Sequence, residues 1–514
     1  MDYQGFVDGD KTLLVAPAGY GKTHTIVESL KYSSGKQLIL THTHAGVSSL
    51  KEKIKNENIP LQKYIVETIS SFSQRYVLAF CDRADIPDQE DVQFHSVIIK
   101  AANDILQSTV IQKIIRASYC GLFVDEYQDC TKSQHDIIMA LGKVLPTHIL
   151  GDPLQGIFDF NEELVDFETD LTEFEIFPEL DTPNRWYKEG HNSELGDEIK
   201  EYREPLKGGG GINLVHKPSI GLYVFDINDG DFDNADSNYR KVLTALIGNR
   251  RNNHDYDSLL ILVPEYSEFE NGRFIRKGNI TDRSKIITKI DFSNSVRLIE
   301  AIDDKSFYQC AKDIDGIIDS ILRARKPRKK VYELLSKYFC KTSPNRQVNV
   351  GLNDWMSVSP RNTGGDLYVK NKNGENRHLS DSLSELIGSL ISCPSINCIY
   401  QLICFVKNDL KLKRKPRREL LNSVMKSIQY SVQENTTVYD AMRQHKNIVR
   451  RMGRKVDGKC IGTTLLTKGL EFDTVVILDA HKFNCPKHLY VALTRCCKNL
   501  IIFTGQRVLP TFNR

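Results

Sequence analysis

The sequence lacks any uninterrupted apolar run close to the roughly 20 residues that a membrane-spanning helix requires. Residues 1–5 have neither the basic start nor the apolar core of a secretory signal. The 12 cysteines include no paired Cys-x-x-Cys module, and the neighbouring Cys393, Cys398 and Cys404 lack zinc-finger spacing. We therefore expect a cytoplasmic protein with reduced thiols, without a membrane partner, a structural zinc or an iron–sulfur cluster.

An excess of one charge sign is also missing. The chain has 69 Lys and Arg against 66 Asp and Glu, a net charge of +3, which excludes a histone-like polycation. Any nucleic-acid site must come from local basic clusters, and two are visible at residues 323–330 and 411–418. These clusters could contact duplex phosphates, or they could form a solvated helix face or a partner-docking surface. The sequence leaves these alternatives open.

The chain has 514 residues, of which 40% are apolar and 26% charged, and this ordinary globular composition predicts two to four domains. Short apolar runs separated by helical segments are typical of strands in parallel sheets. Such runs occur at residues 12–15, 37–41, 121–125, 148–152, 222–225, 258–263, 474–478 and 500–503. A glycine-rich linker at residues 207–211 separates the first four runs from the last four.

These patterns predict an α/β fold with two parallel-sheet lobes, each carrying a mainly helical insertion. The first lobe, lobe 1, should comprise residues 1–73 and 119–206, with a small helical insertion at 74–118. The second lobe, lobe 2, should comprise residues 212–289 and 456–514, with a basic helical insertion at 290–455. Since α/β sheets bind ligands at the carboxyl ends of their strands, chemistry is expected in the loops that follow them.

The first predicted strand leads into Ala-Pro-Ala-Gly-Tyr-Gly-Lys-Thr. Gly19 and Gly21 permit a backbone path that turns N–H groups inward, and the N-terminus of the following helix favours an anion. Lys22 should reach the β- and γ-phosphates of a nucleotide, and the Thr23 hydroxyl should bind Mg²⁺. The strict pattern has a glycine in place of Ala16, so a glycine turn before a surface lysine is the alternative.

Another predicted strand, residues 121–124, ends directly at Asp125 and Glu126. Carboxylate oxygens suit Mg²⁺, so Asp125 would hold this ion, usually through water. Glu126 would orient and deprotonate an attacking water. The alternative is an acidic pair that faces solvent, which the four preceding apolar residues make less favourable. Together with the phosphate loop, the pair indicates hydrolysis of a nucleoside triphosphate.

Further candidate residues follow the strand at 148–152 and the linker. Gln155 is placed to contact the γ-phosphate. Phe158 and Phe160 could stack on unpaired bases, or they could pack in a core. Arg495, with Arg185 as a second candidate, could neutralise charge on the transferring phosphoryl group, although each could also form a surface ion pair.

In this order the segments resemble the UvrD/Rep branch of superfamily 1 helicases. The matching motifs are the phosphate loop at residues 16–23, DEYQD at 125–129, the glutamine and aromatic segment at 151–160, Asn184 with Arg185, KGLEFD at 468–473 and YVALTR at 490–495. The resemblance implies two RecA-like lobes that hold ATP and Mg²⁺ between them. It also implies a 3′-to-5′ motor on single-stranded or forked DNA.

The resemblance also assigns roles by position. Nucleotide contacts fall on Ala16, Ala18, Gly19, Tyr20, Gly21, Lys22, Thr23, His24, Glu471 and, nearer to the phosphate loop than the family spacing, Gln4. Catalytic roles fall on Lys22, Glu126, Gln155 and two arginine fingers, Arg185 and Arg495. DNA contacts fall on Thr41, His42, Thr68, Phe158, Phe160 and Thr463, and Mg²⁺ ligands on Thr23 and Asp125.

Three positions depart from the family pattern. Leu465 stands where the family has a histidine, so the coupling between the strand and the nucleotide could differ. Asn184 replaces an aromatic residue, which leaves adenine stacking to Trp186, to Tyr187 or to no residue. His42 replaces a phenylalanine that stacks on a base. A strict preference for ATP does not follow from these residues.

Two functions therefore stay open. The first is an ATP-dependent 3′-to-5′ DNA helicase or translocase. The second is a nucleic-acid-gated NTPase that senses DNA ends or forks, regulates a partner nuclease and unwinds little itself. Compact UvrD-like chains of this kind resemble the helicase subunits of bacterial anti-phage systems such as Gabija, in which an OLD-family nuclease is the partner. RNA as the track also stays open, because stacking loops accept either polymer.

Overall fold

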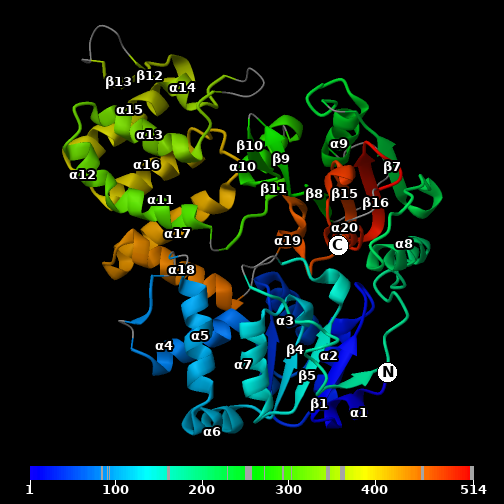
Figure 1. The fold of residues 1–514 in the computed structure, drawn as a ribbon. Coiled ribbons are helices and arrows are strands. Elements are labelled where there is room, and N and C mark those ends of the chain that lie inside the picture. The colour runs from blue at the N-terminus through cyan, green and yellow to red at the C-terminus, as the bar shows by residue number, and fades with distance from the viewer. Residues whose placement is uncertain are drawn as a thin grey trace. The chain divides into compact units, whose positions relative to one another are not determined.

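The computed structural model describes residues 1–82, 85–88, 91, 93–158, 162–228, 230–248, 258–270, 272–291, 295–302, 304–342, 348–358, 365–452 and 456–509. The chain divides into two compact units, Met1–Ile299 with Arg450–Arg514, and Glu300–Val449. The first unit contains both large parallel sheets, and the second is mainly helical (Figure 1). The predicted fold class, α/β with two RecA-like lobes, is confirmed.

The sheet of lobe 1 has six parallel strands in the order β3-β2-β4-β5-β1-β6. The strands are β1 (Lys11–Val15), β2 (Gln37–Thr41), β3 (Tyr64–Thr68), β4 (Gly121–Val124), β5 (Thr147–Gly151) and β6 (Glu175–Phe177). Every residue of β2, β4 and β5 is buried, which explains why their sequences are almost continuously apolar. The pairs Thr41 with Thr68 and Val15 with Gly151 align the carboxyl ends of four strands at one edge.

Helices cover this sheet and form the small insertion. They are α1 (Tyr3–Asp8), α2 (Lys22–Tyr32), α3 (His44–Asn56), α4 (Ile69–Phe80), α5 (Phe94–Leu106), α6 (Thr109–Ser118) and α7 (Lys132–Gly142). Helix α8 (Ser193–Lys207) packs instead in the core of lobe 2. In α5 the buried side chains of Phe94, Ile98, Ala102 and Leu106 recur every four residues. This spacing places them on one helix face, and α5 packs with it against α4 and α7.

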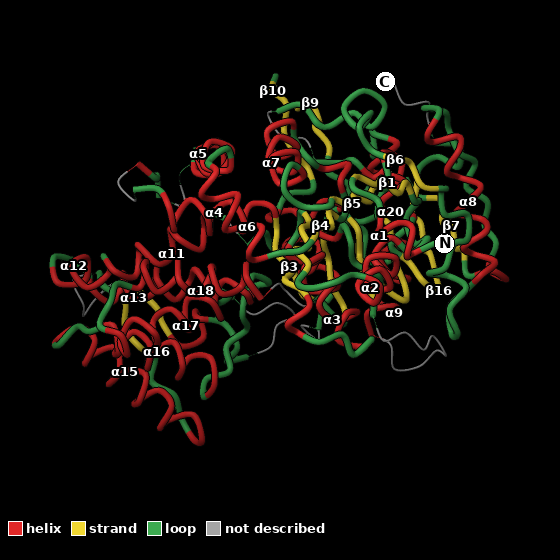
Figure 2. The backbone as a smooth tube through the Cα atoms, turned by 90° about the horizontal axis from the view of Figure 1, so that it is seen from below, coloured by secondary structure: helices red, strands yellow, loops and turns green. Residues whose placement is uncertain are grey.

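The sheet of lobe 2 also has six parallel strands, in the order β11-β14-β8-β15-β16-β7. They are β7 (Leu222–Asp226), β8 (Leu259–Leu262), β11 (Arg297–Leu298), β14 (Lys459–Gly462), β15 (Phe472–Ile477) and β16 (Cys496–Thr504). The accompanying elements are α9 (Asn238–Gly248), α10 (Ile280–Ile290), α19 (Thr464–Thr467), α20 (Pro486–Leu493) and an antiparallel hairpin of β9 (Tyr266–Glu270) and β10 (Arg273–Lys277). The strands of both lobes stand out among the helices in Figure 2.

The second unit is built from helices around one hydrophobic core. They are α11 (Lys305–Asp315), α12 (Ile317–Leu322), α13 (Pro327–Tyr338), α14 (Leu352–Trp355), α15 (Arg377–Ser392), α16 (Ile396–Asn408), α17 (Arg418–Glu434) and α18 (Val438–Met452), with a short ladder of β12 (Met356–Val358) and β13 (Leu367–Val369). None of the helices in the described parts of the chain is long and apolar enough to cross a membrane.

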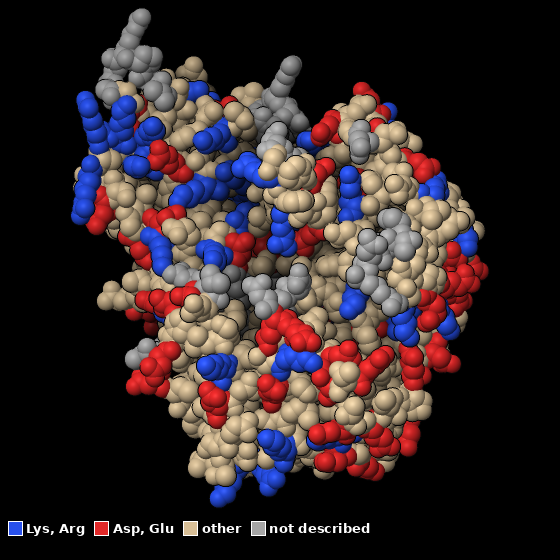
Figure 3. Space-filling model, viewed as in Figure 1, with Lys and Arg blue, Asp and Glu red and all other residues tan. Residues whose placement is uncertain are grey.

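The two predicted basic clusters lie in this helical unit and differ from each other. Lys and Arg side chains gather on the side that carries α12 and α13 (Figure 3), where the Arg323 side chain is 84% exposed. In the second cluster the Arg417 guanidinium is hydrogen-bonded within the unit. Its Nε donates to the buried Glu300 at 2.7 Å and its Nη2 to Ser306 at 2.6 Å. Arg417 therefore serves the fold and is not available to a phosphate.

Several strands were not predicted from the sequence: β3, β6 and the four strands between residues 266 and 369 that lie outside the main sheets, together with β11 and β14. The segment from 290 to 455 is thus not purely helical, since it contains β11, β12 and β13. In β3 buried and half-buried residues alternate, and β11 has only two residues. Such short or half-exposed strands give weak sequence signals.

Candidate functional site

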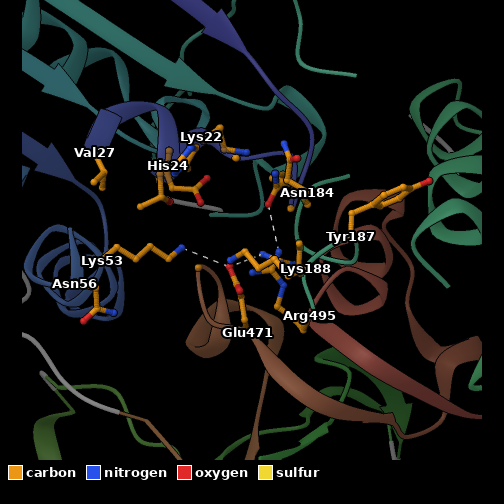
Figure 4. Close-up of a pocket in the computed structure, with 18 of the residues that line it drawn as sticks. Lys22, His24, Val27, Lys53, Asn56, Asn184, Tyr187, Lys188, Glu471 and Arg495 are labelled. Carbon is orange, nitrogen blue, oxygen red and sulfur yellow. Dashed lines mark hydrogen bonds and ion pairs between the residues drawn. The ribbon is translucent and has the colours of Figure 1, made fainter. Parts of the chain in front are cut away.

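A cavity of about 600 Å³ lies where the carboxyl edge of the lobe 1 sheet meets lobe 2 (Figure 4). This volume falls in the range of ordinary ligand sites. The sequence-predicted residues on its lining are Ala18, Gly19, Gly21, Lys22, Thr23, His24, Glu126, Gln155, Arg185, Glu471 and Arg495. Figure 4 shows Lys22 and His24 on one side of the cavity and Glu471 and Arg495 on the other. Residues from both lobes, from Tyr3 to Arg495, therefore share one site.

The loop between β1 and α2 has the backbone path expected of an anion cradle. Gly19 has a φ of +80° and Gly21 a φ of +114°, both in the left-handed region that favours glycine. A Cβ at Gly19 would lie 2.6 Å from a ring carbon of Trp186, so a larger residue would also clash. Helix α2 begins at Lys22 and directs its N-terminus at the cavity, which favours a phosphate there.

Lys22 is buried, and its ammonium is held by the loop itself. Its Nζ donates to the carbonyl oxygens of Ala16 at 2.8 Å and of Pro17 at 3.4 Å. Ala16 is fully buried and does not line the cavity, so its predicted contact with a nucleotide is replaced by this contact with Lys22. Tyr20 is likewise buried beneath the loop.

Asp125 and Glu126 follow β4 directly, as the sequence predicts. Glu126 has a φ of +57°, a strained conformation for a non-glycine residue that is common at functional sites. Its backbone N–H donates to Asp125 Oδ1 at 2.9 Å, and its Oε2 accepts from Gln128 Nε2 at 2.6 Å. The carboxylate of Glu126 is thus oriented by a neighbour that the sequence analysis did not single out.

The two carboxyl groups have opposite pKa shifts. Burial and the Glu126 charge raise the pKa of Asp125. Burial also opposes ionisation of Glu126, but Lys22, Lys468 and the Gln128 hydrogen bond outweigh it and lower the pKa of Glu126. Glu126 is therefore ionised and able to accept a proton. A positive charge added near Asp125 would favour the ionised form of its carboxyl group.

A second, smaller cavity of about 20 Å³ lies beside Thr23, Asp125 and Glu126. A volume of this size holds about one water or one small ion. A hydroxyl and a carboxylate are ligands that Mg²⁺ accepts, with its other positions filled by water and phosphate oxygens. No cluster of three or more His, Cys, Asp or Glu suited to a metal occurs among the residues that the structure describes. The donor set thus fits Mg²⁺ that arrives with a nucleotide.

Gln155 joins the two lobes at the cavity. Its Nε2 donates to Asp152 Oδ2 at 2.8 Å, and its Oε1 accepts from Arg495 Nη2 of lobe 2 at 3.4 Å. Asp152 is held in turn by two hydrogen bonds from Arg203, at 2.9 and 3.0 Å. Arg203 also donates to the hydroxyl of Tyr490 at 3.1 Å. A buried network therefore connects β5, α8 and α20 behind the predicted γ-phosphate position.

Both predicted arginine fingers line the cavity. Arg185 is 7% exposed and Arg495 is 1% exposed. Arg185 donates to the carbonyl of Thr494 and to Glu471 Oε1 at 3.3 Å, and its Nε has no hydrogen-bond partner. Burial and the Arg185 charge lower the pKa of Arg495 to about 10. Two buried guanidinium groups side by side, one with an unused donor, favour a polyanionic ligand.

Glu471 lies on the cavity lining close to the cations Arg185 and Lys53. Burial raises its pKa, but Arg185, Lys53 and Lys188 outweigh burial and lower it. Lys53 Nζ lies 3.5 Å from Glu471 Oε1, so α3 of lobe 1 is also tied to lobe 2 (Figure 4). An ionised Glu471 is able to accept hydrogen bonds from ligand hydroxyls.

The part of the cavity expected to hold the base differs from the sequence-based expectation. Gln4 is exposed, bonds to Asp8 at 2.8 Å and does not line the cavity, whereas Tyr3 does. Trp186 is 1% exposed and packs in the core, so it cannot stack on a base. Tyr187 lines the cavity, while Asn184 is occupied in a hydrogen bond to the Tyr20 carbonyl at 2.8 Å.

The residues predicted to contact DNA fall into two groups. Thr41 and Thr68 are register partners at the carboxyl ends of β2 and β3, and Thr68 caps α4. The ring of His42 stacks with that of Phe158, with centroids 6.4 Å apart. Burial and the Lys468 charge lower the pKa of His42 to about 3, so this ring is neutral.

The remaining predicted DNA contacts are placed as follows. Thr463 caps α19 at the carboxyl end of β14, and it is 1% exposed, so its hydroxyl is covered in this conformation. Phe160 lies outside the described residues. The structure thus brings together Thr41, His42 and Phe158 on lobe 1, and Thr463 stands on the other lobe.

Four functional candidates were missed from the sequence: Gln128, Lys53, Arg203 and Lys468. Gln128 and Lys468 lie inside the recognised DEYQD and KGLEFD segments, so their motifs could have drawn attention to them. Lys53 and Arg203 lie on helices outside any motif, and only their tertiary contacts reveal them.

Two parts of the chain are similar to known helicase families. Residues 85–167 match the UvrD/REP helicase N-terminal domain, and residues 368–504 match the viral superfamily 1 RNA helicase core domain. The first match contains the Asp125–Asp129 segment and the second contains the Lys468–Asp473 segment, which are the two that meet at the cavity. The phosphate loop lies outside both matches, so its assignment depends on its own geometry.

Two relatives, each described as a subunit of an ATP-dependent helicase/nuclease, are similar over a limited stretch. The protein from Alkaliphilus metalliredigens (strain QYMF) is 26% identical over 162 residues, which is 32% of this chain and 12% of that protein. The protein of the same description from Alkaliphilus oremlandii (strain OhILAs) is 26% identical over 185 residues, 36% of this chain and 14% of that protein. The matched part therefore spans about an eighth of the length of these relatives.

Proposed function

We propose that this chain hydrolyses ATP in the cavity between its two lobes and thereby moves 3′ to 5′ along single-stranded DNA, as a helicase or translocase. The observation that carries the proposal is the meeting of the phosphate loop, Glu126 and Gln155 of lobe 1 with Arg495 of lobe 2 in one cavity. A catalytic site that two lobes complete makes hydrolysis depend on how the lobes close. The similarity of two segments to superfamily 1 helicase families supports this function.

In the proposed reaction the loop N–H groups and the N-terminus of α2 bind the phosphates. Lys22 exchanges its present carbonyl partners for β- and γ-phosphate oxygens. Thr23 and Asp125 would hold Mg²⁺, which when bound neutralises charge on these oxygens. Arg185 and Arg495 would stabilise the charge that develops on the transferring phosphoryl group.

Glu126 would accept the proton of the attacking water while the water oxygen bonds to the γ-phosphorus and the bond to the ADP oxygen breaks. Its lowered pKa keeps it ionised, and the hydrogen bond from Gln128 fixes its direction. Gln155, which contacts Arg495, is placed to respond to the presence of the γ-phosphate. Loss of the phosphate would then loosen the contact between the lobes.

The proposed track runs past the Phe158 ring, which would stack on unpaired bases. The neutral His42 ring beside it offers a second stacking surface. DNA is the proposed polymer because the order of the motifs resembles the UvrD/Rep helicases, a resemblance that the UvrD/REP match supports, whereas the second matched family is an RNA helicase core. RNA is therefore the necessary comparison in any test.

The test is steady-state ATP hydrolysis with single-stranded DNA, forked DNA and RNA, together with unwinding of duplexes that carry 3′ or 5′ tails. The proposal predicts hydrolysis that DNA stimulates and unwinding that requires a 3′ tail. The Lys22→Ala variant should lose both activities. Unwinding by a folded Lys22→Ala variant, or a requirement for 5′ tails, would contradict the proposal.

A second function, a nucleic-acid-gated NTPase that regulates a nuclease, is favoured by one observation. The relatives are described as helicase/nuclease subunits, yet the matched stretch is only 12–14% of their length. A motor of this kind could act on a nuclease in trans, and an OLD-family nuclease is the class we propose. DNA-stimulated hydrolysis without any unwinding by the isolated chain would favour this second function.

A further inference from the structure

The cavity extends from the phosphate loop to an end that helices of lobe 1 surround, which we call the α3 end. The residues that line this end come from α1, from α2 and from the end of α3, and they are Tyr3, His24, Val27, Asn56 and Glu57. Figure 4 shows Val27 and Asn56 on the opposite side of the cavity from Tyr187. Because the phosphates are assigned to Lys22 and the arginines, the α3 end has room for the base of the nucleotide.

The amide side chain at the α3 end is able to bind either purine. Gln4, which the resemblance assigns to the nucleotide, hydrogen-bonds to Asp8 at 2.8 Å and does not line the cavity. Asn56 lines it instead, and an amide carries both a donor and an acceptor. Adenine presents its N6–H donor beside the N1 acceptor, and guanine presents its O6 acceptor beside the N1–H donor. Asn56 therefore does not restrict the cavity to adenine.

Glu57 adds a group that only accepts hydrogen bonds. Its Oε2 accepts from Lys31 Nζ at 2.9 Å, and Lys31 also donates to Glu28 at 2.6 Å. The hydrogen bond from Lys31 and its charge lower the pKa of Glu57, so this carboxyl group is ionised. Among the described residues, Lys31 is the only hydrogen-bond donor to the Glu57 side chain. The second oxygen, Oε1, is therefore available to a ligand in the cavity.

An ionised carboxylate distinguishes the two purines by their hydrogen-bonding edges. Guanine presents two neighbouring donors, N1–H and the 2-amino group, and a carboxylate is able to accept both at once. Adenine presents one donor, N6–H, and its neighbouring N1 carries a lone pair that would face the second carboxylate oxygen. A carboxylate at the base therefore favours guanine over adenine.

We propose that the cavity takes guanosine triphosphate as a substrate in addition to ATP, and that Glu57 binds the guanine base. Glu57 accepts hydrogen bonds from N1–H and the 2-amino group, and the neighbouring Asn56 donates to O6. Hydrolysis follows the course proposed for ATP, in which the water oxygen bonds to the γ-phosphorus while the bond to the GDP oxygen breaks. The inference rests on the proposed function, because it widens the substrate class of the same site.

Two other arrangements predict different measurements. In the first, Glu57 only forms a surface ion pair with Lys31, and its loss changes the kinetics with both nucleotides by the same factor. In the second, the base stacks on Tyr187, whose hydroxyl donates to Asp197 Oδ1 at 2.9 Å. Stacking does not distinguish the bases, because every base has a π-face. In both arrangements the ratio of kcat/KM for GTP to that for ATP does not depend on Glu57.

The experiment measures steady-state hydrolysis of ATP, GTP and inosine triphosphate (ITP) by the full chain with saturating single-stranded DNA. ITP lacks the 2-amino group of GTP, so it removes one of the two proposed donors. The wild type should hydrolyse GTP at least as efficiently as ATP, and ITP less efficiently than GTP. In Glu57→Gln the GTP-to-ATP ratio of kcat/KM should fall about 10-fold. This is the low end for a hydrogen bond to a charged group, because Glu57 is 45% exposed.

Glu52→Gln is the matched control, since Glu52 is exposed on α3 and lies outside the cavity lining. It should keep the wild-type ratio, and ATP hydrolysis by Glu57→Gln shows that this variant is folded. A wild type that hydrolyses ATP but not GTP would overturn this inference alone, as would an unchanged GTP-to-ATP ratio in Glu57→Gln. A wild type that hydrolyses none of the nucleotides with any strand would contradict the proposed function, and the inference with it.

Discussion

The two lobes contribute opposite edges of their sheets to the same cavity. In lobe 1 the contributing residues follow β1, β4 and β5, at the carboxyl ends of the strands. In lobe 2 Glu471 immediately precedes β15 and Arg495 immediately precedes β16, at the amino ends. These two residues are neighbours because Phe472 and Cys496 pair in the sheet and the Phe472 N–H donates to the Arg495 carbonyl.

The chemistry of the two edges also differs. Lobe 1 supplies the glycine cradle and the acidic pair, whereas lobe 2 supplies buried cations and one acid tied to Arg185. Lobe 1 holds the proposed base Glu126 together with Lys22 and Arg185, and lobe 2 adds the counter-charge of Arg495 for the proposed phosphoryl transfer. Two sheets of the same class thus have complementary roles, and the complete site exists only where they meet.

Among the variants, loss of the lobe 2 cation Arg495 should lower the rate of ATP hydrolysis most. Arg495→Ala is expected to lower kcat for ATP hydrolysis by about 10³- to 10⁵-fold, the effect typical of an arginine finger. The control Arg507→Ala removes a lobe 2 arginine that pairs with Asp226 at 2.6 Å outside the cavity. Comparable kinetics for the two variants would contradict the role of Arg495.

Removal of the proposed lobe 1 base, Glu126, should have the next largest effect. Glu126→Gln keeps the size of the side chain but cannot accept the proton, and kcat should fall about 10²- to 10⁴-fold. Nucleotide affinity should stay within a few-fold of the wild type, which equilibrium titration with a fluorescent ATP analogue measures. Glu173→Gln, at an exposed lobe 1 pair with Lys11, is the control. Near wild-type hydrolysis by Glu126→Gln would show that another group accepts the proton.

The part of lobe 1 that is proposed to contact the strand should show a smaller effect. Phe158→Ala is expected to weaken binding of single-stranded DNA by about 1–3 kcal/mol, or roughly 5- to 150-fold in Kd. Fluorescence anisotropy with a labelled oligonucleotide measures the change. Phe274→Ala, at a 75% exposed aromatic on β10, should leave the affinity unchanged. Weaker binding by Phe274→Ala with unchanged binding by Phe158→Ala would indicate that the strand contacts the lobe 2 hairpin.

The smallest expected effect concerns stability against acid, which should differ between the lobes. His148 of β5 is buried between aromatic rings, and burial lowers its pKa to about 4 from the ordinary 6.5. Between these values the unfolded chain binds more protons than the folded chain, so stability is lost as pH falls from 6.5 towards 4. None of the described strands of the lobe 2 sheet contains a histidine.

Comparison with His148→Gln isolates this contribution from other titrating groups. From pH 7.5 to pH 5 the wild type should lose about 2 kcal/mol more unfolding free energy than the variant. Denaturant titration at both pH values gives this difference. Hydrogen exchange should then show earlier opening of lobe 1 than of lobe 2. An equal pH dependence of the wild type and His148→Gln would exclude His148 as the cause.

The lobe 1 half of the site was predictable because its information is local. Apolar strands at 12–15, 121–124 and 148–151 run into glycines or acids, and the rule that α/β sheets bind ligands at carboxyl strand ends applies directly. The fold class was confirmed for the same reason. The Asn-Gly pair at residues 271–272 was an available hairpin signal that the sequence analysis did not use for β9 and β10.

The lobe 2 half is different, because its residues act through contacts that are remote in sequence. Lys468 and Asp129 are 339 residues apart, and Arg203 and Tyr490 are 287 apart. Such pairings leave no periodicity or spacing to detect. Trp186 was a local signal that misled. Its place beside a motif arginine suggested stacking on a base, but its side chain packs against Gly19 and Gly196 in the core.

In the proposed reaction both lobes act on one phosphoryl group. A double-mutant cycle on ATP hydrolysis with Lys22→Ala, Arg495→Ala and the double variant tests this claim directly. If both side chains stabilise the same transition state, their effects are strongly non-additive, and the double variant should be about as slow as the slower single variant. Rate losses that multiply in the double variant would show that the two lobes act independently and would contradict the account.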